Sequence, residues 1–111
     1  MTTAGELARK LNTDPRNVAI HSITARELGV PLTQWIETLR NLPTAEEVAE
    51  QVGVSPTTVR RKFRKWLARR GLSPRFFVYY DQRQVMKAGK PATLTVRTLR
   101  IPREFVEGVF G

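Results

Sequence analysis

Apolar side chains recur every three or four residues along most of the N-terminal two thirds of the chain, which is the spacing of amphipathic helices. Thr, Asp or Ser precede several of these segments as N-caps, and proline or glycine separates most of them. Together these signals predict five helices, at about residues 3–11, 15–28, 32–42, 44–52 and 56–70. In the fifth helix, Val59, Phe63, Trp66 and Leu67 form one apolar stripe on an otherwise basic rod.

Downstream of the fifth helix the pattern changes to one that favours strands. Residues 76–80 are aromatic or β-branched and residues 93–97 alternate with period two, so we expect an antiparallel hairpin within residues 76–99. Its tip is expected to be a long loop over residues 81–91, which contain a glycine and a proline. Residues 103–110 should add one or two helical turns whose apolar side chains pack on the core or on a second subunit.

The chain has 111 residues, of which 41% are apolar and 26% charged, a composition typical of a folded domain with one core. It contains no cysteine, which excludes disulfides, thiolate metal sites and a cysteine nucleophile. His21 is the single histidine, and we expect it to be a surface or core residue rather than a ligand. The sequence shows neither a leader-like start nor an apolar run of membrane-spanning length, so we expect a cytoplasmic protein.

The formal net charge of +9 is unevenly distributed. Residues 1–50 carry five Lys/Arg and seven Asp/Glu, whereas residues 51–111 carry fourteen and three. Base composition of the genome would not place the arginines in one half. We therefore expect a nucleic-acid-binding surface in the second half, against the alternatives of a solvated basic face or an acidic membrane or protein partner.

One segment, residues 47–59, combines features that a closely crossed pair of helices requires. Ala49 supplies a small side chain midway along the first helix, and Gly53 can take the positive backbone angle of the turn. Four valines fall where such a pair buries its apolar side chains, at Val48, Val52, Val54 and Val59. The segment resembles the helix-turn-helix superfamily of bacterial and archaeal regulators and sigma factors. It departs at Lys62, where an apolar residue is common, and Phe63 is expected to take that role.

The order of elements over residues 32–100 extends the resemblance, because a helix, a helix-turn-helix and a two-stranded hairpin follow one another in winged-helix proteins. The resemblance implies that residues 56–70 form a recognition helix in the major groove of DNA, with the hairpin as a wing against the backbone or the minor groove. The predicted fold class is mainly α with a C-terminal β-hairpin. It comprises an N-terminal helical extension, a winged helix-turn-helix domain and an apolar C-terminal tail, at residues 1–30, 31–102 and 103–111.

The recognition helix places its basic and hydroxyl side chains mostly opposite its apolar stripe. Those near its start are candidates for base edges, because arginine can pair with guanine and threonine can meet a thymine methyl group. These candidates are Thr57, Thr58, Arg60, Arg61 and Arg64. The N-cap serine, the other cations of the helix and those of the hairpin are expected to contact the DNA backbone. They are Ser55, Lys62, Lys65, Arg69, Arg70, Arg83, Lys87 and Lys90.

The sequence also matches itself when shifted by 41 residues. Residues 3–8 then align with residues 44–49, and without a gap Asn12 falls at the position of Gly53. Asparagine is the next best residue after glycine for a positive backbone angle. A second helix-turn-helix at the N-terminus is therefore one interpretation.

This N-terminal unit has Arg16 and Asn17 on its would-be recognition face but no basic cluster. We therefore expect it to serve packing or dimerisation rather than DNA reading. A competing alignment of residues 25–30 with residues 49–54 also works, which shows that the match is permissive.

Enzymatic function is not expected, because the sequence has no phosphate-binding glycine loop, no paired carboxylates in an apolar setting and no nucleophile near a histidine. Asp81 is the only carboxylate between Glu50 and Glu104, so the basic half cannot assemble an acidic metal cluster. We expect no catalytic residue, metal or cofactor, and nothing marks a small-molecule site.

The favoured interpretation is a sequence-specific protein for double-stranded DNA, a nucleoid-associated transcriptional regulator that forms a homodimer through its N-terminal helices or its C-terminal tail. One alternative is a DNA-targeting or assembly component for replication, partition or transposition, with a protein partner on the acidic N-terminal half. Another is a protein that binds structured RNA.

Overall fold

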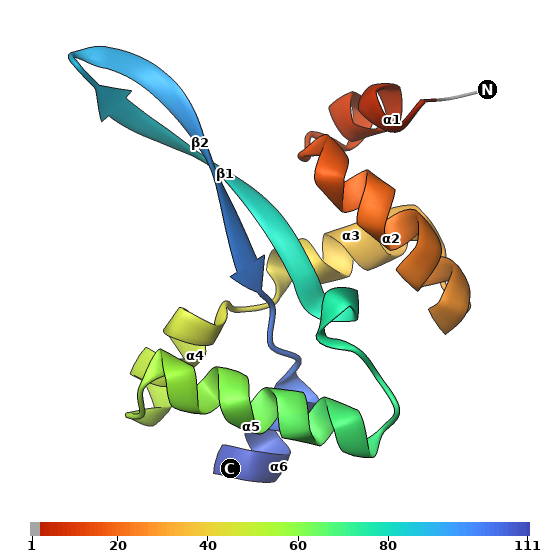
Figure 1. Ribbon diagram of the computed structural model, residues 1–111, viewed down its shortest axis with the longest axis vertical. Helices are drawn as coiled ribbons and strands as arrows, with labels where there is room; N and C mark the ends of the chain where they lie inside the picture. Colours follow the sequence, from red (N-terminus) through yellow and green to blue (C-terminus); the bar gives the residue numbers. More distant parts are fainter. Residues whose placement is uncertain (1–2) are drawn as a thin grey trace.

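The computed structural model describes residues 3–111 and is mainly helical, with an antiparallel hairpin near the C-terminus (Figure 1). The helices of this part of the chain are α1 (Ala4–Leu11), α2 (Pro15–Leu28), α3 (Leu32–Asn41), α4 (Ala45–Val52), α5 (Pro56–Arg69) and α6 (Arg103–Phe110). A 3-10 turn, η1 (Pro74–Phe77), leads into strands β1 (Val78–Lys87) and β2 (Lys90–Leu99). The predicted mainly α fold with a C-terminal β-hairpin is confirmed.

The helices begin where the sequence predicts because side chains cap them. Thr3, Asp14, Thr44 and Ser55 each accept a hydrogen bond from a backbone N–H of the following turn. At α4 the cap is reciprocal, because the Glu47 carboxylate also accepts the N–H of Thr44, at 3.2 Å. All five predicted helices end within one residue of their expected bounds.

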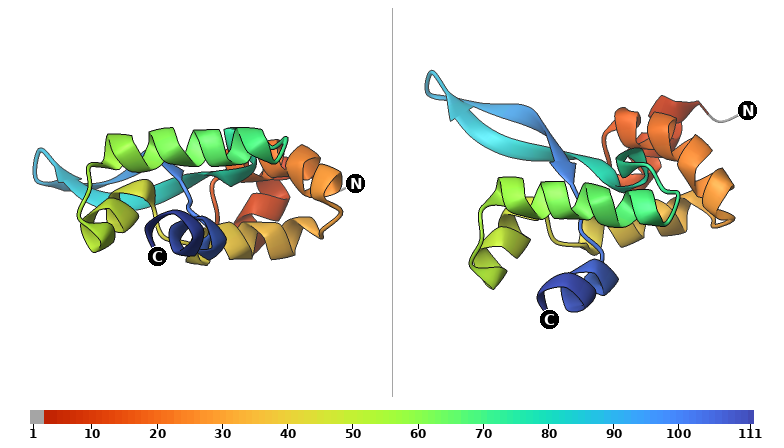
Figure 2. Two further views of the ribbon diagram at one scale, coloured as in Figure 1. Left: turned by 90° about the horizontal axis from the view of Figure 1, so that it is seen from below. Right: turned by 60° about the horizontal axis from the view of Figure 1, so that its bottom comes forward.

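The molecule, with its hairpin, measures 41 × 39 × 16 Å, and the hairpin projects at one edge of the flat helical body (Figures 1 and 2). Seen edge-on, α2 and α5 lie toward one broad side, whereas α3 and α6 lie toward the other (Figure 2). A thickness of 16 Å leaves room for two layers of helices at the usual spacing of about 8–10 Å. We call the side that carries α2 and α5 the front.

One cluster of buried side chains joins the three segments into which the sequence divides the chain. Phe63 lies in this cluster, with its ring centroid 5.3 Å from that of Phe77 and 5.1 Å from that of Phe105. The cluster also includes Ala8 and Val18 from the N-terminal helices. Of the two roles expected for the C-terminal tail, Phe105 therefore takes the first, because it packs on the core of its own chain.

The hairpin ends in a two-residue turn, so the expected long loop over residues 81–91 is wrong. Ala88 and Gly89 have φ angles of 52° and 76°, which fit a type I′ turn, whose twist matches that of paired strands. Strand pairing continues up to this turn and includes Pro91. The proline is tolerated because it takes a non-hydrogen-bonded position of the ladder, where no N–H is needed. Residues 76–77, predicted as strand, belong to η1.

The outer edge of β1 is covered by α2, and two α2 side chains replace the hydrogen bonds of a third strand. Asn17 Nδ2 donates to the Tyr80 carbonyl at 3.0 Å, and Asn17 Oδ1 accepts the Tyr80 N–H at 2.8 Å. One helical turn later, His21 Nε2 lies 2.6 Å from the Val78 carbonyl oxygen. The spacings match because four helical residues rise about 6 Å and two strand residues about 6.6 Å. Asn17, expected on an exposed face, is therefore fully buried, as is His21.

Replacing Asn17 with alanine should lower the free energy of unfolding by about 1–3 kcal/mol, because the Tyr80 N–H and carbonyl lose their partner. Urea denaturation followed by circular dichroism measures this loss. The matched control is Arg16→Ala, whose exposed guanidinium lies 5.4 Å from the centroid of the Tyr80 ring. This control should change stability by less than about 0.5 kcal/mol. Equal stability of Asn17→Ala and the wild type would contradict the edge pairing.

His21 makes stability depend on pH. Because a carbonyl can only accept, Nε2 carries the proton and Nδ1 accepts from the Thr24 hydroxyl at 2.6 Å. Burial lowers the pKa of His21 from its ordinary 6.5, and the Val78 carbonyl offsets part of this effect.

The unfolded chain therefore takes up a proton at a higher pH than the folded protein. The free energy of unfolding should be highest above about pH 6.5 and should fall as the pH drops through and below that value. Thermal unfolding at about pH 7.5 and about pH 5.5 checks this, and His21→Gln should reduce the difference in Tm between the two conditions. A wild-type Tm that does not fall on acidification would refute the assignment.

Candidate nucleic-acid interface

α5 presents a basic surface because its large apolar residues pack toward the core. Val59, Phe63 and Leu67 are fully buried. Arg61 lies about 200° around the helix from Val59 and is exposed. The exposed polar residues of this helix and its C-cap are Thr57, Arg61, Lys62, Arg64, Lys65, Arg69 and Arg70.

Two of the five residues expected to contact bases are engaged within the protein. Arg60 Nη1 lies 2.7 Å from Glu46 Oε1 and so connects α5 to α4. Thr58 Oγ1 lies 2.9 Å from Ser55 Oγ, which also accepts the N–H of Thr58 as the N-cap of α5. The other three are Thr57, Arg61 and Arg64. Within residues 3–111, their side chains make neither hydrogen bonds nor ion pairs.

Three lysine and arginine side chains of α5 lie on its flank toward α6. Lys62 Nζ is 5.7 Å from the centroid of the Phe110 ring. Lys65 and Arg69 line a surface hollow together with Val109 of α6. The positive charges on this flank are therefore held beside α6, at one border of the exposed α5 surface.

Arg70, the C-cap of α5, differs from these cations. It lies about 20° around the helix from Val59, on the side of the core rather than on that of Arg61. Its guanidinium carbon stacks over the Trp66 ring at 3.7 Å from the centroid. Arg70 is therefore directed away from the surface that the other cations form.

The opposite flank of α5 faces the base of the hairpin. Arg60 and Arg64 line a hollow there together with Val78 and Arg97. Arg97 is exposed and makes no side-chain hydrogen bond within residues 3–111. Arg97 is not among the DNA contacts expected from the sequence. The alternation of residues 93–97 places Arg97 in a strand, but only the packing shows that its face of the strand meets α5.

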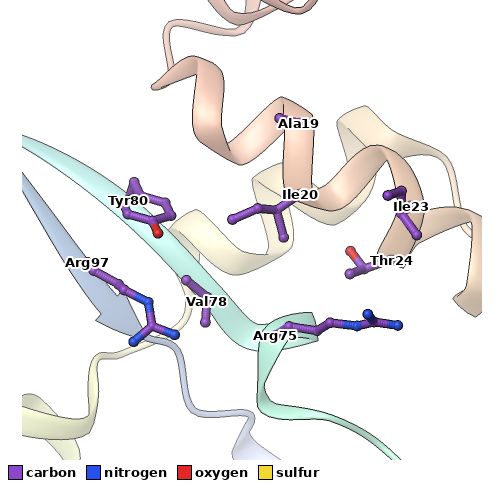
Figure 3. A pocket seen from close by; sticks show the side chains of 8 residues that line it. All are labelled: Ala19, Ile20, Ile23, Thr24, Arg75, Val78, Tyr80 and Arg97. Carbon is purple, nitrogen blue, oxygen red and sulfur yellow. The ribbon is translucent and has the colours of Figure 1, made fainter.

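Arg97 also lines a groove of about 380 Å³ between α2 and the hairpin. Figure 3 shows this groove, with Ile20 and Ile23 on the α2 side and Tyr80 and Arg97 on the hairpin side. Arg75 of η1 borders it as well. The same part of the hairpin is thus flanked by the basic surface of α5 and by an apolar surface of α2.

The three cations expected at the hairpin share one face of it. Arg83 pairs in register with Leu94, and Lys87 pairs with Lys90. Positions two or four apart along a strand point to the same side, so Arg83, Lys87 and Lys90 line up along one face. All three are exposed. The structure therefore brings the predicted hairpin cations together.

The first helix pair, α1 and α2, has the same build as the second helix pair, α4 and α5. A shift of 41 residues superposes the bounds of both helices. Asn12 has a φ of 52° where Gly53 has 78°. In both pairs the following residue donates its N–H to the carbonyl five positions back. The internal repeat in the sequence therefore corresponds to a repeat in the structure.

The competing alignment of residues 25–30 has a structural cause as well. Gly29 has a φ of 72°, and the N–H of Val30 donates to the carbonyl of Ala25. This is the same helix ending. However, α2 and α3 have 14 and 10 residues, whereas α4 and α5 have 8 and 14. Only the shift of 41 residues therefore aligns two helix pairs whose helices have the same lengths.

The surfaces of the two pairs differ. Ile20 and Ile23 of α2 stand at the positions of Arg61 and Arg64 in α5. The start of α2 is turned toward the hairpin, where buried Asp14 accepts hydrogen bonds from side chains of both strands. The first pair therefore packs against the hairpin, which agrees with the packing role expected for it.

Within residues 3–111, no helix is long and apolar enough to cross a membrane, and no group of three His, Asp or Glu side chains could hold a metal ion. No family model matches the chain, and no curated protein or solved structure is similar enough to be matched with it. The geometry of this chain alone therefore carries the functional inference.

Proposed function

We propose that this protein is a winged helix-turn-helix protein that binds double-stranded DNA, with α5 in the major groove and the hairpin as its wing. The observation that carries the proposal is the basic surface of α5, where Thr57, Arg61 and Arg64 face solvent between two further groups of cations. α4, α5 and the turn at Gly53 supply the helix-turn-helix, and the hairpin follows η1 directly in the chain.

The dimensions support this arrangement. A helix with its side chains is about 10–12 Å across, and the major groove of B-DNA is about 12 Å wide. A helix lying in the groove has one phosphate backbone on each side. Cations lie on both sides of α5. Lys62 and Lys65 of α5 lie toward α6, and Arg97 of β2 lies on the side of the hairpin.

All of the sequence-predicted contacts except Arg70 have a role in the proposal, and Arg97 joins them. Thr57, Arg61 and Arg64 read base edges. Lys62, Lys65, Arg69 and Arg97, with the hairpin cations Arg83, Lys87 and Lys90, neutralise phosphates. Ser55 and Thr58 cap the start of α5 through their bonds to each other, and Arg60 connects α5 to Glu46 of α4. Arg70 is not part of the proposed interface.

The function we propose is sequence-specific recognition by a transcriptional regulator, and dimerisation stays a prediction. Selection from random duplex DNA tests both. A palindromic consensus supports a homodimer on two half-sites, whereas a single short consensus supports a monomer. Competition with a structured RNA of similar length is the matched control. Preferential binding of the RNA, or selection of no consensus at all, would overturn the proposal.

DNA affinity should fall steeply with salt, because the cations on α5 and the hairpin displace counterions from several phosphates. We expect a slope of log Kd against log salt concentration of about 4 or steeper, for about five or more phosphate contacts. Fluorescence anisotropy between about 50 and about 200 mM salt measures this slope. A flat dependence would be incompatible with binding through this surface.

Arg61→Ala should weaken binding to the preferred site by about 1–3 kcal/mol and should relax the preference at one base pair per half-site. Binding to random DNA should change much less. Selection profiles of the variant and the wild type measure the difference.

Arg70→Ala is the matched control, because it removes an arginine of the same helix that points toward Trp66 instead. It should leave both the consensus and the affinity nearly unchanged. If Arg70→Ala loses as much affinity as Arg61→Ala, or if Arg61→Ala keeps the full consensus, α5 does not face DNA as proposed.

A further inference from the structure

The tip of the hairpin carries an apolar pair that no contact inside the protein explains. Met86 and Pro91 are partners in register and so lie side by side on one face of the ribbon. Met86 is 71% exposed, more than any other large hydrophobic side chain in residues 3–111. A single exposed apolar side chain is ordinary, but this one stands at the end of a projecting element (Figure 1).

Positive charge lies next to this apolar pair along the ribbon. Lys87 and Lys90 form the next pair toward the turn and lie on the opposite face of the ribbon, which Arg83 also occupies. Asp81, the carboxylate of the hairpin, lies at its base, and its Oδ2 is 2.6 Å from Arg100 Nη2. The outer part of the hairpin therefore has its apolar pair on one face and its cations on the other. This charge favours a polyanion as the partner of the tip.

The hairpin is long enough to reach the groove next to the one that holds α5. Beyond Gln82, whose amide donates to Asp14 at the start of α2, the five residues from Arg83 to Lys87 are exposed, so the ribbon extends about 16 Å past that contact at about 3.3 Å per residue. Its two backbones are about 4.8 Å apart between their centres, so the ribbon with its atoms is wider than the roughly 6 Å minor groove of straight B-DNA and enters where a kink opens that groove. With α5 in the major groove, the neighbouring groove along the duplex is a minor groove.

The base of the hairpin is fixed to the body of the protein. The turn of the hairpin has two residues, and its base is held by the Asn17 and Asp81 contacts on different sides. A methionine or proline side chain pressed into a minor groove can enter between base pairs and partly unstack them. The resulting kink bends the duplex toward the major groove and lets it cover more of the protein surface.

We propose that Met86, backed by Pro91, inserts between base pairs from the minor groove and bends the bound DNA. This inference rests on the proposed function, because it requires α5 to bind the same duplex. If Met86 bends the DNA, the protein is an architectural factor as well as a sequence-specific DNA-binding protein. Sequence preference then extends to an easily unstacked pyrimidine–purine step at the position under the hairpin tip.

The test measures binding and bending separately on one probe. The full-length protein is added to a duplex of about 30 base pairs that carries the selected consensus and a fluorophore at each end. Anisotropy reports binding, and energy transfer between the fluorophores reports bending. The wild type should raise both signals.

Met86→Gln keeps the length of the side chain but makes it polar, so it should reduce the energy-transfer change at saturation by at least half, with at most a tenfold loss of affinity. Met86→Leu should restore bending. Leu94→Gln, a change of an exposed apolar residue on the other face of the hairpin, is the matched control and should bend DNA as the wild type does. Circular dichroism verifies that each variant is folded.

Bending by Met86→Gln equal to that of the wild type, or wild-type binding without bending, would overturn this inference and leave the proposed function standing. Loss of bending in Leu94→Gln to the same degree would assign the effect to the whole tip and also overturn it. Absence of anisotropy change with the wild type would instead refute the proposed function itself.

Discussion

The hydrogen bonds between α2 and the edge of β1 are the interaction on which the rest of the structure depends. A two-stranded hairpin is marginal in water without further support, and Asn17 and His21 supply that support by taking the outward backbone groups of Tyr80 and Val78. Every buried side-chain nitrogen and oxygen within residues 3–111 has a hydrogen-bond partner. Because directional bonds set the angle of β1 against α2, they also set the direction in which the hairpin leaves the flat helical body (Figure 1).

Arg100 holds the other side of the hairpin base. It is nearly buried, and its guanidinium donates to Asp81, to the Thr98 hydroxyl and to the Leu42 carbonyl. The same group lies 4.9 Å from the centroid of the Tyr79 ring. A buried arginine is tolerated only when its donors are satisfied and its charge is paired. The positive charge of Arg100 is therefore paired inside the fold. The positive charge that is available to attract a polyanion is smaller than the net charge of residues 51–111.

Two helix pairs of one build serve different purposes in this chain. Both end their first helix with a residue at positive φ, Asn12 in one and Gly53 in the other. In the first pair the second helix meets the hairpin with polar side chains at its start, followed by the half-buried Ile20 and the exposed Ile23. In the second pair the equivalent surface is left to solvent and filled with arginine. In our proposal the first pair positions the wing and the second pair reads DNA, so two helix pairs with the same backbone carry different surface chemistry.

The sequence by itself determined the helices, because caps, prolines and the 3.6-residue period act within a few residues of each other, and it also located the basic face of α5. The long loop predicted from the sequence for the hairpin tip is wrong. Gly89 and Pro91 favour a loop locally, whereas strand pairing along the ladder and a type I′ turn at Ala88 and Gly89 extend the strands to the tip. Only the tertiary structure buried Asn17, turned Arg70 onto Trp66 and brought Arg97 beside α5. These features depend on contacts between residues far apart in the chain, and local spacing carries no information about which faces will meet.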